Sequence, residues 1–307
     1  MEKGLVIKCV GSSYRVKRIN GEKITCMIRG KLRMKGVKTT NPVTVGDFVD
    51  IEIVDGGKNG IIRSVHDRRN YIIRKSTNLS RQHHVIAANI DQAFLMATLA
   101  YPETTPTFID RFLATAEAYR IPVIILFNKM DMYSDSMLEY LDHLTGIYKT
   151  IGYECISTSA VTGENTETVR NLMKGKISLV SGHSGVGKSL LINVIEPGLD
   201  LKIKEISSYH LKGKHTTTFS EMFELSCGGY IIDTPGIKAF GLTDMYKEEI
   251  YHFFPEMFRL SSECRFYNCT HLHEPGCAVK KGVEDGKISE SRYISYLGMM
   301  EEDSKYR

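Results

Sequence analysis

Hydrophobic and polar positions follow two different patterns along this chain. In the first 75 residues, short runs alternate apolar and polar side chains and are separated by turn-forming residues such as Asn20-Gly21 and the Asp-Gly-Gly at 55–57. Such runs predict strands, and they lie at 5–7, 14–16, 24–28 and 48–53. About five strands in so short a segment are typical of a small barrel.

From residue 76 onward, strand-like and helix-like segments alternate. Apolar runs predict strands at 85–99, 121–127, 154–157, 177–180 and 229–232. Helical periodicity predicts helices at 108–119, 136–149, 167–173 and 190–195. This alternation predicts an α/β domain with a mainly parallel sheet, in which ligands bind at the carboxyl ends of the strands.

Composition limits the class of protein. The 307 residues are enough for two or three domains, and 42% hydrophobic with 25% charged residues is ordinary globular composition. No apolar run approaches the ~20 residues of a membrane span. The start of the chain lacks a signal-peptide layout. The seven cysteines, odd in number and unevenly spread, favour a reducing compartment over a disulfide framework. We therefore expect a cytoplasmic protein with no membrane partner.

The net charge of +4 conceals an uneven distribution. Residues 1–75 hold 17 Lys and Arg against 7 Asp and Glu, a net +10, so the rest of the chain sums to −6. The basic residues gather in two groups: Lys31, Arg33, Lys35 and Lys38, then Arg63, Arg68, Arg69, Arg74 and Lys75. Such spacing suits a nucleic-acid backbone and favours an oligonucleotide-binding (OB) barrel that contacts structured RNA. A basic face kept for solubility, or a barrel that contacts protein, is the alternative.

The most specific motif is a glycine-rich loop between a predicted strand and a predicted helix. Its residues are Gly182, His183, Ser184, Gly185, Val186, Gly187, Lys188, Ser189 and Leu190. The glycines let backbone amides face a phosphate, Lys188 supplies a cation, and the Ser189 hydroxyl can ligate Mg²⁺. We therefore predict a phosphate-binding loop, against the alternative of a chance glycine-rich turn.

A second motif, Asn128-Lys129-Met130-Asp131, directly follows a predicted strand. Asp131 can accept hydrogen bonds from guanine N1 and N2, Asn128 can bond the N7 side, and Lys129 can lie over the ring. Adenine offers no matching donors, so a preference for guanine of about 10- to 1,000-fold is expected. After the next strand, Ser159-Ala160 can direct the Ala160 amide at guanine O6. The motifs together predict that GTP and GDP bind here.

These two motifs stand in an unusual order. An ordinary GTPase has its phosphate loop first, whereas here the base-reading motif precedes that loop by about fifty residues. Domain termini usually lie close together at the surface, so joining them and opening the chain elsewhere leaves a packed sheet unchanged. The order therefore predicts a circularly permuted GTPase domain.

Two further segments have the character of nucleotide switches. In Asp233-Thr234-Pro235-Gly236, Asp233 is expected to hold Mg²⁺ through water, and the Gly236 amide can contact the γ-phosphate. Upstream, the polar segment 213–218 resembles a first switch, in which Thr217 is our choice of Mg²⁺ ligand.

The residue after Asp-Thr-Pro-Gly is Ile237, where many GTPases carry a glutamine that orients the attacking water. Ile237 cannot bond water, so intrinsic hydrolysis should be slow. Either His215 or a partner then completes the site; alternatively, His215 is a polar switch residue without catalytic duty. The catalytic set that we predict is His215, Lys188, Thr217 and Gly236.

The C-terminal region holds a cluster of soft ligands. Cys264, Cys269, His271 and Cys277 are enough for one closed tetrahedral Zn²⁺ site. The last ~60 residues are too few to bury a sufficient core unaided, and a structural metal would stabilise them. Free thiols are the alternative, and His273 is a possible substitute ligand.

We predict an OB barrel at 1–75, a GTPase domain at 76–243 and a small, mainly helical zinc domain at 244–307.

The barrel, the permuted motifs and the C-x4-C-x-H-x5-C tail together resemble the circularly permuted GTPases of the RsgA (YjeQ) family across essentially the whole chain. The resemblance implies a GTPase that is stimulated by the small (30S) ribosomal subunit and acts late in its maturation. It also implies binding to 16S rRNA and release of the protein itself or an assembly factor. The family's switch histidine maps onto His215. A monomer is expected. A non-ribosomal regulatory GTPase and an RNA-binding scaffold with structural GTP remain as alternatives.

Overall fold

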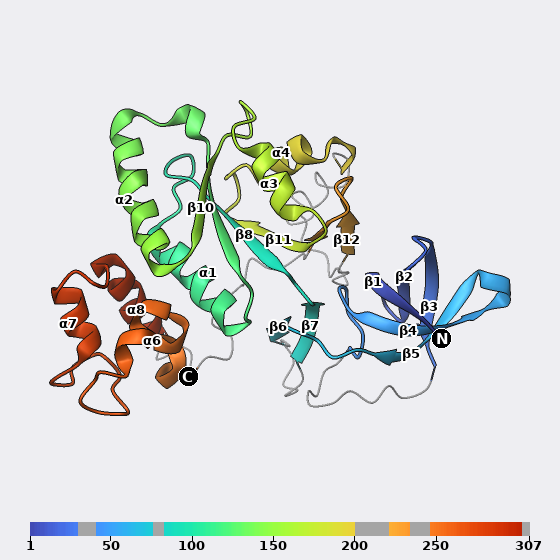
Figure 1. Ribbon diagram of the computed structural model, residues 1–307, viewed down its shortest axis with the longest axis horizontal. Helices are drawn as coiled ribbons and strands as arrows, with labels where there is room; N and C mark the ends of the chain where they lie inside the picture. Colours follow the sequence, from blue (N-terminus) through green and yellow to red (C-terminus); the bar gives the residue numbers. More distant parts are fainter. Residues whose placement is uncertain (30–40, 76–82, 200–220, 234–245, 303–307) are drawn as a thin grey trace. The chain divides into compact units, whose positions relative to one another are not determined.

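The computed structural model describes residues 1–29, 41–75, 83–199, 221–233 and 246–302, and the remaining residues lie outside the description (Figure 1). The chain forms two compact units. Unit 1 consists of Met1–Ala93, Thr166–Val180 and Ser189–Ala239, and unit 2 consists of Phe94–Asn165, Ser181–Lys188 and Phe240–Arg307. Each unit is therefore built from segments that are distant in the sequence.

The first part of unit 1 is a closed five-stranded barrel. Its strands are β1 (Glu2–Val10), β2 (Ser13–Arg18), β3 (Lys23–Ile28), β4 (Phe48–Val54) and β5 (Asn59–Val65). They pair in the order β1-β2-β3-β5-β4, and β4 returns to pair with β1. The β3–β5 pair is parallel and the others are antiparallel. This is the partly parallel barrel of an OB fold, so the predicted barrel is confirmed.

Alternation of side chains explains why these strands close around a core. Successive residues of a strand point to opposite faces, so every second apolar residue faces inward. The inward set is fully or almost fully buried and comes from all five strands and one loop. It consists of Val6, Tyr14, Val16, Ile24, Cys26, Val43, Val49, Ile51 and Ile62. Burial raises the pKa of the Cys26 thiol to about 11, so this cysteine is an inert core residue.

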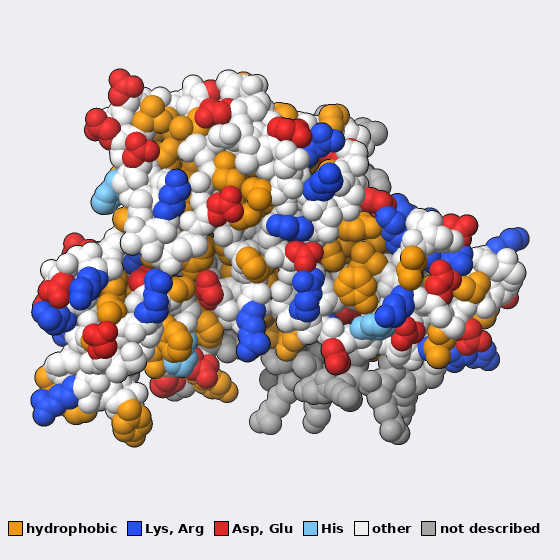
Figure 2. All heavy atoms as spheres, in the orientation of Figure 1, with side chains coloured by type: hydrophobic (Ala, Val, Ile, Leu, Met, Phe, Trp, Pro, Cys, Tyr) orange, Lys and Arg blue, Asp and Glu red, His pale blue; other side chains and the backbone are white. Residues whose placement is uncertain are grey.

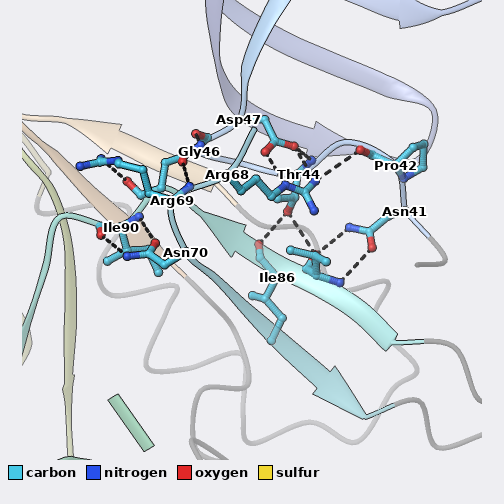
Figure 3. A network of polar contacts seen from close by, with 12 residues as sticks. Asn41, Pro42, Thr44, Gly46, Asp47, Arg68, Arg69, Asn70, Ile86 and Ile90 are labelled. Carbon is cyan, nitrogen blue, oxygen red and sulfur yellow. Dashed lines mark hydrogen bonds and ion pairs between the residues drawn. The ribbon is translucent and has the colours of Figure 1, made fainter. Parts of the chain in front are cut away.

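Much of the basic charge of the barrel segment is paired within unit 1. Arg68 donates from Nε and Nη2 to the two carboxylate oxygens of Asp47 at 2.7 and 2.8 Å, and the Asp47 side chain is fully buried. Asp47 also accepts from the Thr44 amide at 2.8 Å, which fixes the turn that leads into β4 (Figure 3). Arg69 pairs with Asp91 at 2.7 Å. The expectation that Arg68 faces a nucleic-acid backbone is therefore wrong, because this side chain is buried against Asp47. The Arg69 side chain is 61% exposed, so its expected role stays a prediction. The group at 31–38 lies outside the described residues.

The rest of unit 1 contains a separate two-stranded sheet and strands that belong to the same sheet as the barrel. Strands β6 (Tyr71–Lys75) and β7 (His83–Ala88) form an antiparallel pair, and β11 (Ile177–Gly182) pairs in parallel with β13 (Tyr230–Asp233). Helices α3 (Thr166–Met173) and α4 (Lys188–Ile195) flank β11 in the sequence. The expectation of one strand over 85–99 is wrong: the chain bends at Asn89, which has a φ of 55°, and β8 (Gln92–Ala97) starts afresh.

The barrel continues into these strands through β12 (Glu221–Glu224), which pairs with β13 on one side and with β1 on the other. Lys8 is paired with Glu221 both in strand register and by an ion pair of 2.8 Å. Lys23 pairs with Glu224 at 2.9 Å, and Lys17 donates to the Tyr230 hydroxyl at 2.9 Å. Strand β12, which follows the predicted first switch segment, is thus attached to the barrel by backbone pairing with β1 and by ion pairs.

Unit 2 contains the second half of the α/β structure. Strand β9 (Val123–Asn128) is buried throughout and pairs in parallel with β10 (Glu154–Thr158). Helix α1 (Pro106–Ala118) has Pro106 at its first turn and Thr105 as N-cap, whose hydroxyl accepts from the Phe108 amide at 3.3 Å. Helix α2 (Asp135–Ile151) ends at Gly152. These elements match the predicted ones within about two residues.

The C-terminal part of unit 2 is mainly helical, as predicted. It contains the 3-10 segment η5 (Lys247–Phe253) and the helices α6 (Pro255–Ser261), α7 (Ala278–Glu284) and α8 (Glu290–Glu302). Its buried core includes Phe254, Met257, Tyr296 and Met299 together with Ala114 from α1. This C-terminal module therefore shares its core with the α/β part of the same unit.

A buried cluster of charges joins the module to α1. Arg292 on α8 is fully buried and donates from Nη1 to Asp110 on α1 at 2.8 Å. The same guanidinium donates to Glu256 on α6 at 2.7 and 3.2 Å and lies 4.5 Å from the centre of the Phe254 ring. Tyr148 donates to the same Asp110 oxygen at 2.9 Å. Burial raises the pKa of Asp110, and the adjacent guanidinium opposes that shift.

We predict that Arg292→Met lowers the free energy of unfolding by about 3–5 kcal/mol, because it leaves two buried carboxyl groups without their cation. Denaturant unfolding of the purified protein measures this. Lys281→Met is the matched control, since Lys281 pairs with Asp285 at 3.4 Å while its side chain is 72% exposed. The control should cost at most about 1 kcal/mol. Equal losses in the two variants would contradict a structural role for the buried cluster.

Candidate functional site

The glycine-rich loop leaves β11 and leads into α4, the strand–loop–helix context that a phosphate loop requires. Gly182 and Gly187 have φ values of 145° and 98°, which L side chains rarely adopt. Space is also lacking: a Cβ on Gly182 would lie 2.3 Å from the Met96 carbonyl oxygen, and one on Gly187 would lie 2.4 Å from Asn128 Nδ2. Both positions therefore need glycine for conformation and for close approach.

The Asn128 carboxamide connects the loop with the base-reading segments. Its Nδ2 donates to the Val186 carbonyl at 2.9 Å. Its Oδ1 accepts from Thr158 Oγ1 and from the Ala160 amide, each at 3.2 Å. Asn128 is 2% exposed, so these bonds form away from water. The structure thus brings together three segments that the sequence predicted to meet at one ligand.

The neighbouring motif residues lie around this point. Ser159 Oγ donates to Asp131 Oδ1 at 2.5 Å, which holds the carboxylate beside the Ser159-Ala160 turn. Lys129 has a φ of 71° and donates from Nζ to the Tyr101 carbonyl. Met130 and Asp131 belong to the 3-10 turn η2 (Met130–Met132). The Asp131 carboxylate, which is predicted to bind guanine N1 and N2, thus lies on a short 3-10 turn and is held by Ser159.

Lys188 closes the phosphate loop on itself. Its ammonium donates to the carbonyls of Gly182 at 2.7 Å and His183 at 2.5 Å. Burial lowers the pKa of His183, and the nearby Lys188 charge lowers it further, so the imidazole is neutral at pH 7. Lys188 therefore stabilises the conformation of the loop, and the positive charge of the loop lies on the Lys188 ammonium group. Ser184 and Gly185 lie in the same loop, whereas Ser189 and the 46% exposed Leu190 begin α4.

Three residues that sequence reasoning missed support this site. Tyr133 donates to the Asn128 carbonyl at 2.6 Å and accepts from the Leu99 amide at 2.8 Å. The Phe108 ring of α1 lies 3.8 Å from the His183 ring, centre to centre. Pro102 would be 3.2 Å from a Cβ on Gly185. Apart from the Tyr133–Asn128 bond, these contacts join distant segments, so no local motif signals them.

Some predicted site residues are only partly described. Asp233 is the last residue of β13, so its backbone position is known and its side chain is not described. Gly236, Thr217, His215 and Ile237 lie outside the described residues. Their predicted roles stay predictions.

The four predicted metal ligands converge. The Sγ atoms of Cys264, Cys269 and Cys277 and a ring nitrogen of His271 all lie within 4.8 Å of one another. His271 Nδ1 is 3.4 Å from Cys277 Sγ and 3.7 Å from Cys264 Sγ. Two backbone amides donate to the sulfurs: Ala278 to Cys264 at 3.3 Å and Lys280 to Cys277 at 3.4 Å. Three thiols, one imidazole and amide donors to sulfur are the donor set of a structural metal site.

The segment between the ligands is fixed by Glu274 and two tyrosines. The Glu274 carboxylate accepts from the Thr270 amide and hydroxyl at 2.7 and 2.6 Å. Burial would raise the pKa of Glu274, but these hydrogen bonds outweigh it and lower the pKa to about 2. Tyr293 donates to the His271 carbonyl at 2.7 Å, and Tyr296 donates to the Thr270 carbonyl at 2.6 Å. His273, considered as a substitute ligand, is not in the cluster of converging ligand atoms.

Burial and the close packing of the thiols set their charge state. Burial, together with the neighbouring thiols, raises the pKa of Cys269 to about 12. Burial also raises the pKa of Cys277. Thiols packed so closely stay neutral on their own, whereas a bound divalent metal would deprotonate them. Among the described residues, this is the one group of His, Cys and acidic side chains with metal-binding geometry.

The fold and this site define a class of protein, a circularly permuted P-loop GTPase that carries an OB barrel and a cysteine-rich helical module. The sequence matches the RsgA GTPase family over residues 65–243 and the RsgA N-terminal domain over residues 3–62. The chain belongs to the RsgA GTPase family, and it is a GTP hydrolase.

Relatives match along the whole chain. The small ribosomal subunit biogenesis GTPase RsgA of Bacteroides fragilis (strain YCH46) is 59% identical, and the match covers 99% of each chain. The crystal structure of YjeQ from Thermotoga maritima aligns with a TM-score of 0.82 at 36% identity over 100% of this chain and 99% of that chain. YloQ, a circularly permuted GTPase, aligns with a TM-score of 0.77 at 28% identity over 100% and 96%. In the described part of the chain, none of the helices combines the length and hydropathy needed to cross a bilayer.

We predict that Gly187→Ala weakens GTP binding roughly 5- to 150-fold, because a Cβ clashes with Asn128 and a positive φ is strained by about 1–3 kcal/mol in a residue with a side chain. Isothermal titration calorimetry measures the affinity. Gly146→Ala is the matched control, since the Cβ of an alanine at this helical position would meet open space. The control should bind as the wild type does, and wild-type affinity in Gly187→Ala would contradict the role given to the loop.

Proposed function

We propose that this chain binds the small (30S) ribosomal subunit through its 16S rRNA and acts in the late maturation of that subunit. It hydrolyses GTP to GDP with stimulation by the subunit, and hydrolysis releases the protein itself or an assembly factor. The observation that carries this proposal is the junction at Asn128, which joins base-reading segments and phosphate loop within a chain whose relatives are named small ribosomal subunit biogenesis GTPases.

The nucleotide roles follow from the positions of the side chains. Asp131 reads guanine N1 and N2, and the amides of residues 182–187 surround the phosphates. Lys188 leaves its two carbonyl partners for the β- and γ-phosphate oxygens, because phosphate is the stronger acceptor for an ammonium group. Ala160 leaves Asn128 Oδ1 for guanine O6. The Lys188 bonds and the Ala160 bond thus each have a nucleotide bond that replaces them.

Mg²⁺ and the catalytic groups complete the site. Ser189 at the start of α4 and Asp233 at the end of β13 hold the ion, with Thr217 closing on it in the GTP state. The Gly236 amide contacts the γ-phosphate, and His215 positions the attacking water in place of the missing glutamine. The sequence motifs support these roles. The parallel pairing of β11 with β13 supports them too, since the phosphate loop follows the carboxyl end of β11 and Asp233 is the last residue of β13.

Zn²⁺ is the metal that Cys264, Cys269, His271 and Cys277 fit best, one ion per chain. Three thiolates and one imidazole in a closed cluster match the tetrahedral preference of Zn²⁺ for sulfur and nitrogen ligands. When bound, the ion has a structural role, since it neutralises the thiolates inside the module core. The three-domain division at 75/76 and 243/244 is part of this proposal, as are a cytoplasmic location and a monomeric state.

GTP turnover with and without purified small subunits tests the function. Turnover by the wild type should rise in the presence of subunits, by up to about 10³- to 10⁵-fold if the subunit completes the catalytic site. His215→Ala should lose most of the stimulated rate while it keeps GTP affinity, because His215 acts on water and not on the bound nucleotide.

The alternatives give different results in the same assay. A non-ribosomal regulatory GTPase would hydrolyse GTP at a rate that subunits do not change. An RNA-binding scaffold that holds GTP as a structural ligand would bind subunits without turnover. Either outcome would overturn the proposal. A fully active His215→Ala protein would overturn only the catalytic role of His215 and would leave the rest of the proposal standing.

We predict that the purified protein contains one Zn²⁺ per chain and that Cys277→Ser abolishes this content and destabilises the C-terminal module. Cys277 contributes both a ligand and the N-cap of α7. Elemental analysis measures the metal, and limited proteolysis with and without a chelator measures the order of the module. Cys155→Ser, a change in a cysteine of β10 outside the cluster, should keep its metal. Full metal content in Cys277→Ser would contradict the ligand assignment.

A further inference from the structure

The loop between the first two metal ligands exposes aromatic side chains that the proposed zinc site does not need. All residues of this loop, 265–268, are exposed. Tyr267 is 99% exposed, and Phe266 is 39% exposed. In the space-filling view, hydrophobic side chains project from the end of the C-terminal module beside Lys and Arg side chains (Figure 2). A ring this exposed buries little area against its own chain, so its faces are open to a partner.

The loop is rigidly held, although its side chains are exposed. Cys264 and Cys269 bound it on both sides. The Arg265 amide donates to the Gly276 carbonyl at 3.2 Å, and the Cys269 amide donates to the Phe266 carbonyl at 3.2 Å. Gly276 lies so close that a Cβ there would be 3.2 Å from Arg265 Cβ. The backbone that presents Tyr267 is therefore pre-organised, and binding through it costs little conformational entropy.

The loop also carries its own cation. The Arg265 guanidinium carbon lies 5.5 Å from the centre of the Phe266 ring, within the range of a cation–π contact. A planar guanidinium donates well to phosphate, and an aromatic ring stacks on a nucleobase of any identity. Together they match one unpaired nucleotide, whose base stacks on Tyr267 and whose phosphate meets Arg265.

We infer that the 265–268 loop is a second RNA contact of this protein, at which Tyr267 stacks on an unpaired nucleobase and Arg265 contacts an adjacent phosphate. The inference rests on the proposed function, because it takes the RNA of the small subunit as the occupant. The 265–268 loop would contact RNA mainly by shape and base stacking, because the region around it is not basic overall. Residues 246–302 hold 7 Lys and Arg against 10 Asp and Glu, a net −3.

A series of variants separates stacking from simple apolar packing. Binding of GTP-loaded protein to purified small subunits is measured at several salt concentrations. Tyr267→Ala should weaken binding roughly 5- to 150-fold, Tyr267→Leu should weaken it similarly, and Tyr267→Phe should bind as the wild type does. Tyr246→Ala, at another exposed tyrosine of the module that is 71% exposed, is the control and should keep full affinity. Metal content and basal turnover should be unchanged in all four.

The salt dependence tests the two side chains separately. Arg265→Gln should reduce the slope of log affinity against log salt by about 0.7–0.9, as expected for the loss of one phosphate contact. Tyr267→Ala should leave that slope unchanged, because stacking releases no counterion. Full affinity in Tyr267→Leu would show apolar packing instead, and an unchanged slope in Arg265→Gln would remove the phosphate contact; either result overturns the inference.

Cross-linking identifies the occupant. A photoreactive benzophenone side chain in place of Tyr267 should cross-link to 16S rRNA in the bound complex, whereas a cross-link to a ribosomal protein would overturn the inference.

Failure of this inference differs from failure of the proposed function. If the wild type binds subunits and is stimulated by them while the Tyr267 variants behave identically, the loop alone is wrongly assigned. If the wild type neither binds nor is stimulated, the proposed function itself is wrong.

Discussion

The site depends on one buried side chain, the carboxamide of Asn128. Its amide nitrogen bonds the phosphate loop at Val186, and its oxygen accepts from Thr158 and Ala160 at the end of the next strand. An amide group is suited to this junction because it donates and accepts at once, whereas a carboxylate would meet the Val186 carbonyl with a second acceptor. Gly187 has no side chain because Asn128 Nδ2 occupies the space that a Cβ would need. The geometry of the loop and of the base-reading segments is thus set by the same contact.

Circular permutation changes which segments are neighbours in the chain and leaves that contact intact. The parallel pair β9–β10 and the loop after β11 still bring the motifs to the carboxyl ends of their strands, since the packing of a sheet does not depend on the order of its connections. The permutation also places the barrel before the GTPase motifs and the cysteine-rich module after them. Within unit 1 the barrel holds β12, and within unit 2 Arg292 holds α1. Both flanking parts are therefore bound to strands or helices that lead to the nucleotide site.

Two kinds of electrostatic interaction serve these attachments. The Lys8–Glu221 and Lys23–Glu224 pairs are partly exposed, so each contributes little to stability and weakens with salt. The Arg292 cluster is buried, and its loss would leave carboxyl groups stranded away from water. The ion pairs between the barrel and β12 are consequently weaker than the Arg292 cluster.

The sequence alone determined the parts whose physics is local. Alternating strands predicted the barrel, the glycine spacing predicted the phosphate loop, and the cysteine spacing predicted the cluster of candidate metal ligands, because each pattern acts over a few residues. The sequence did not reveal the break at Asn89, the pairing of Arg68 with the buried Asp47, or the support that Tyr133 and Phe108 give to the site. The Arg68–Asp47 pair and the Phe108–His183 contact join residues that are far apart in the chain. Their energies exist only once tertiary packing has brought the partners together and removed water from between them.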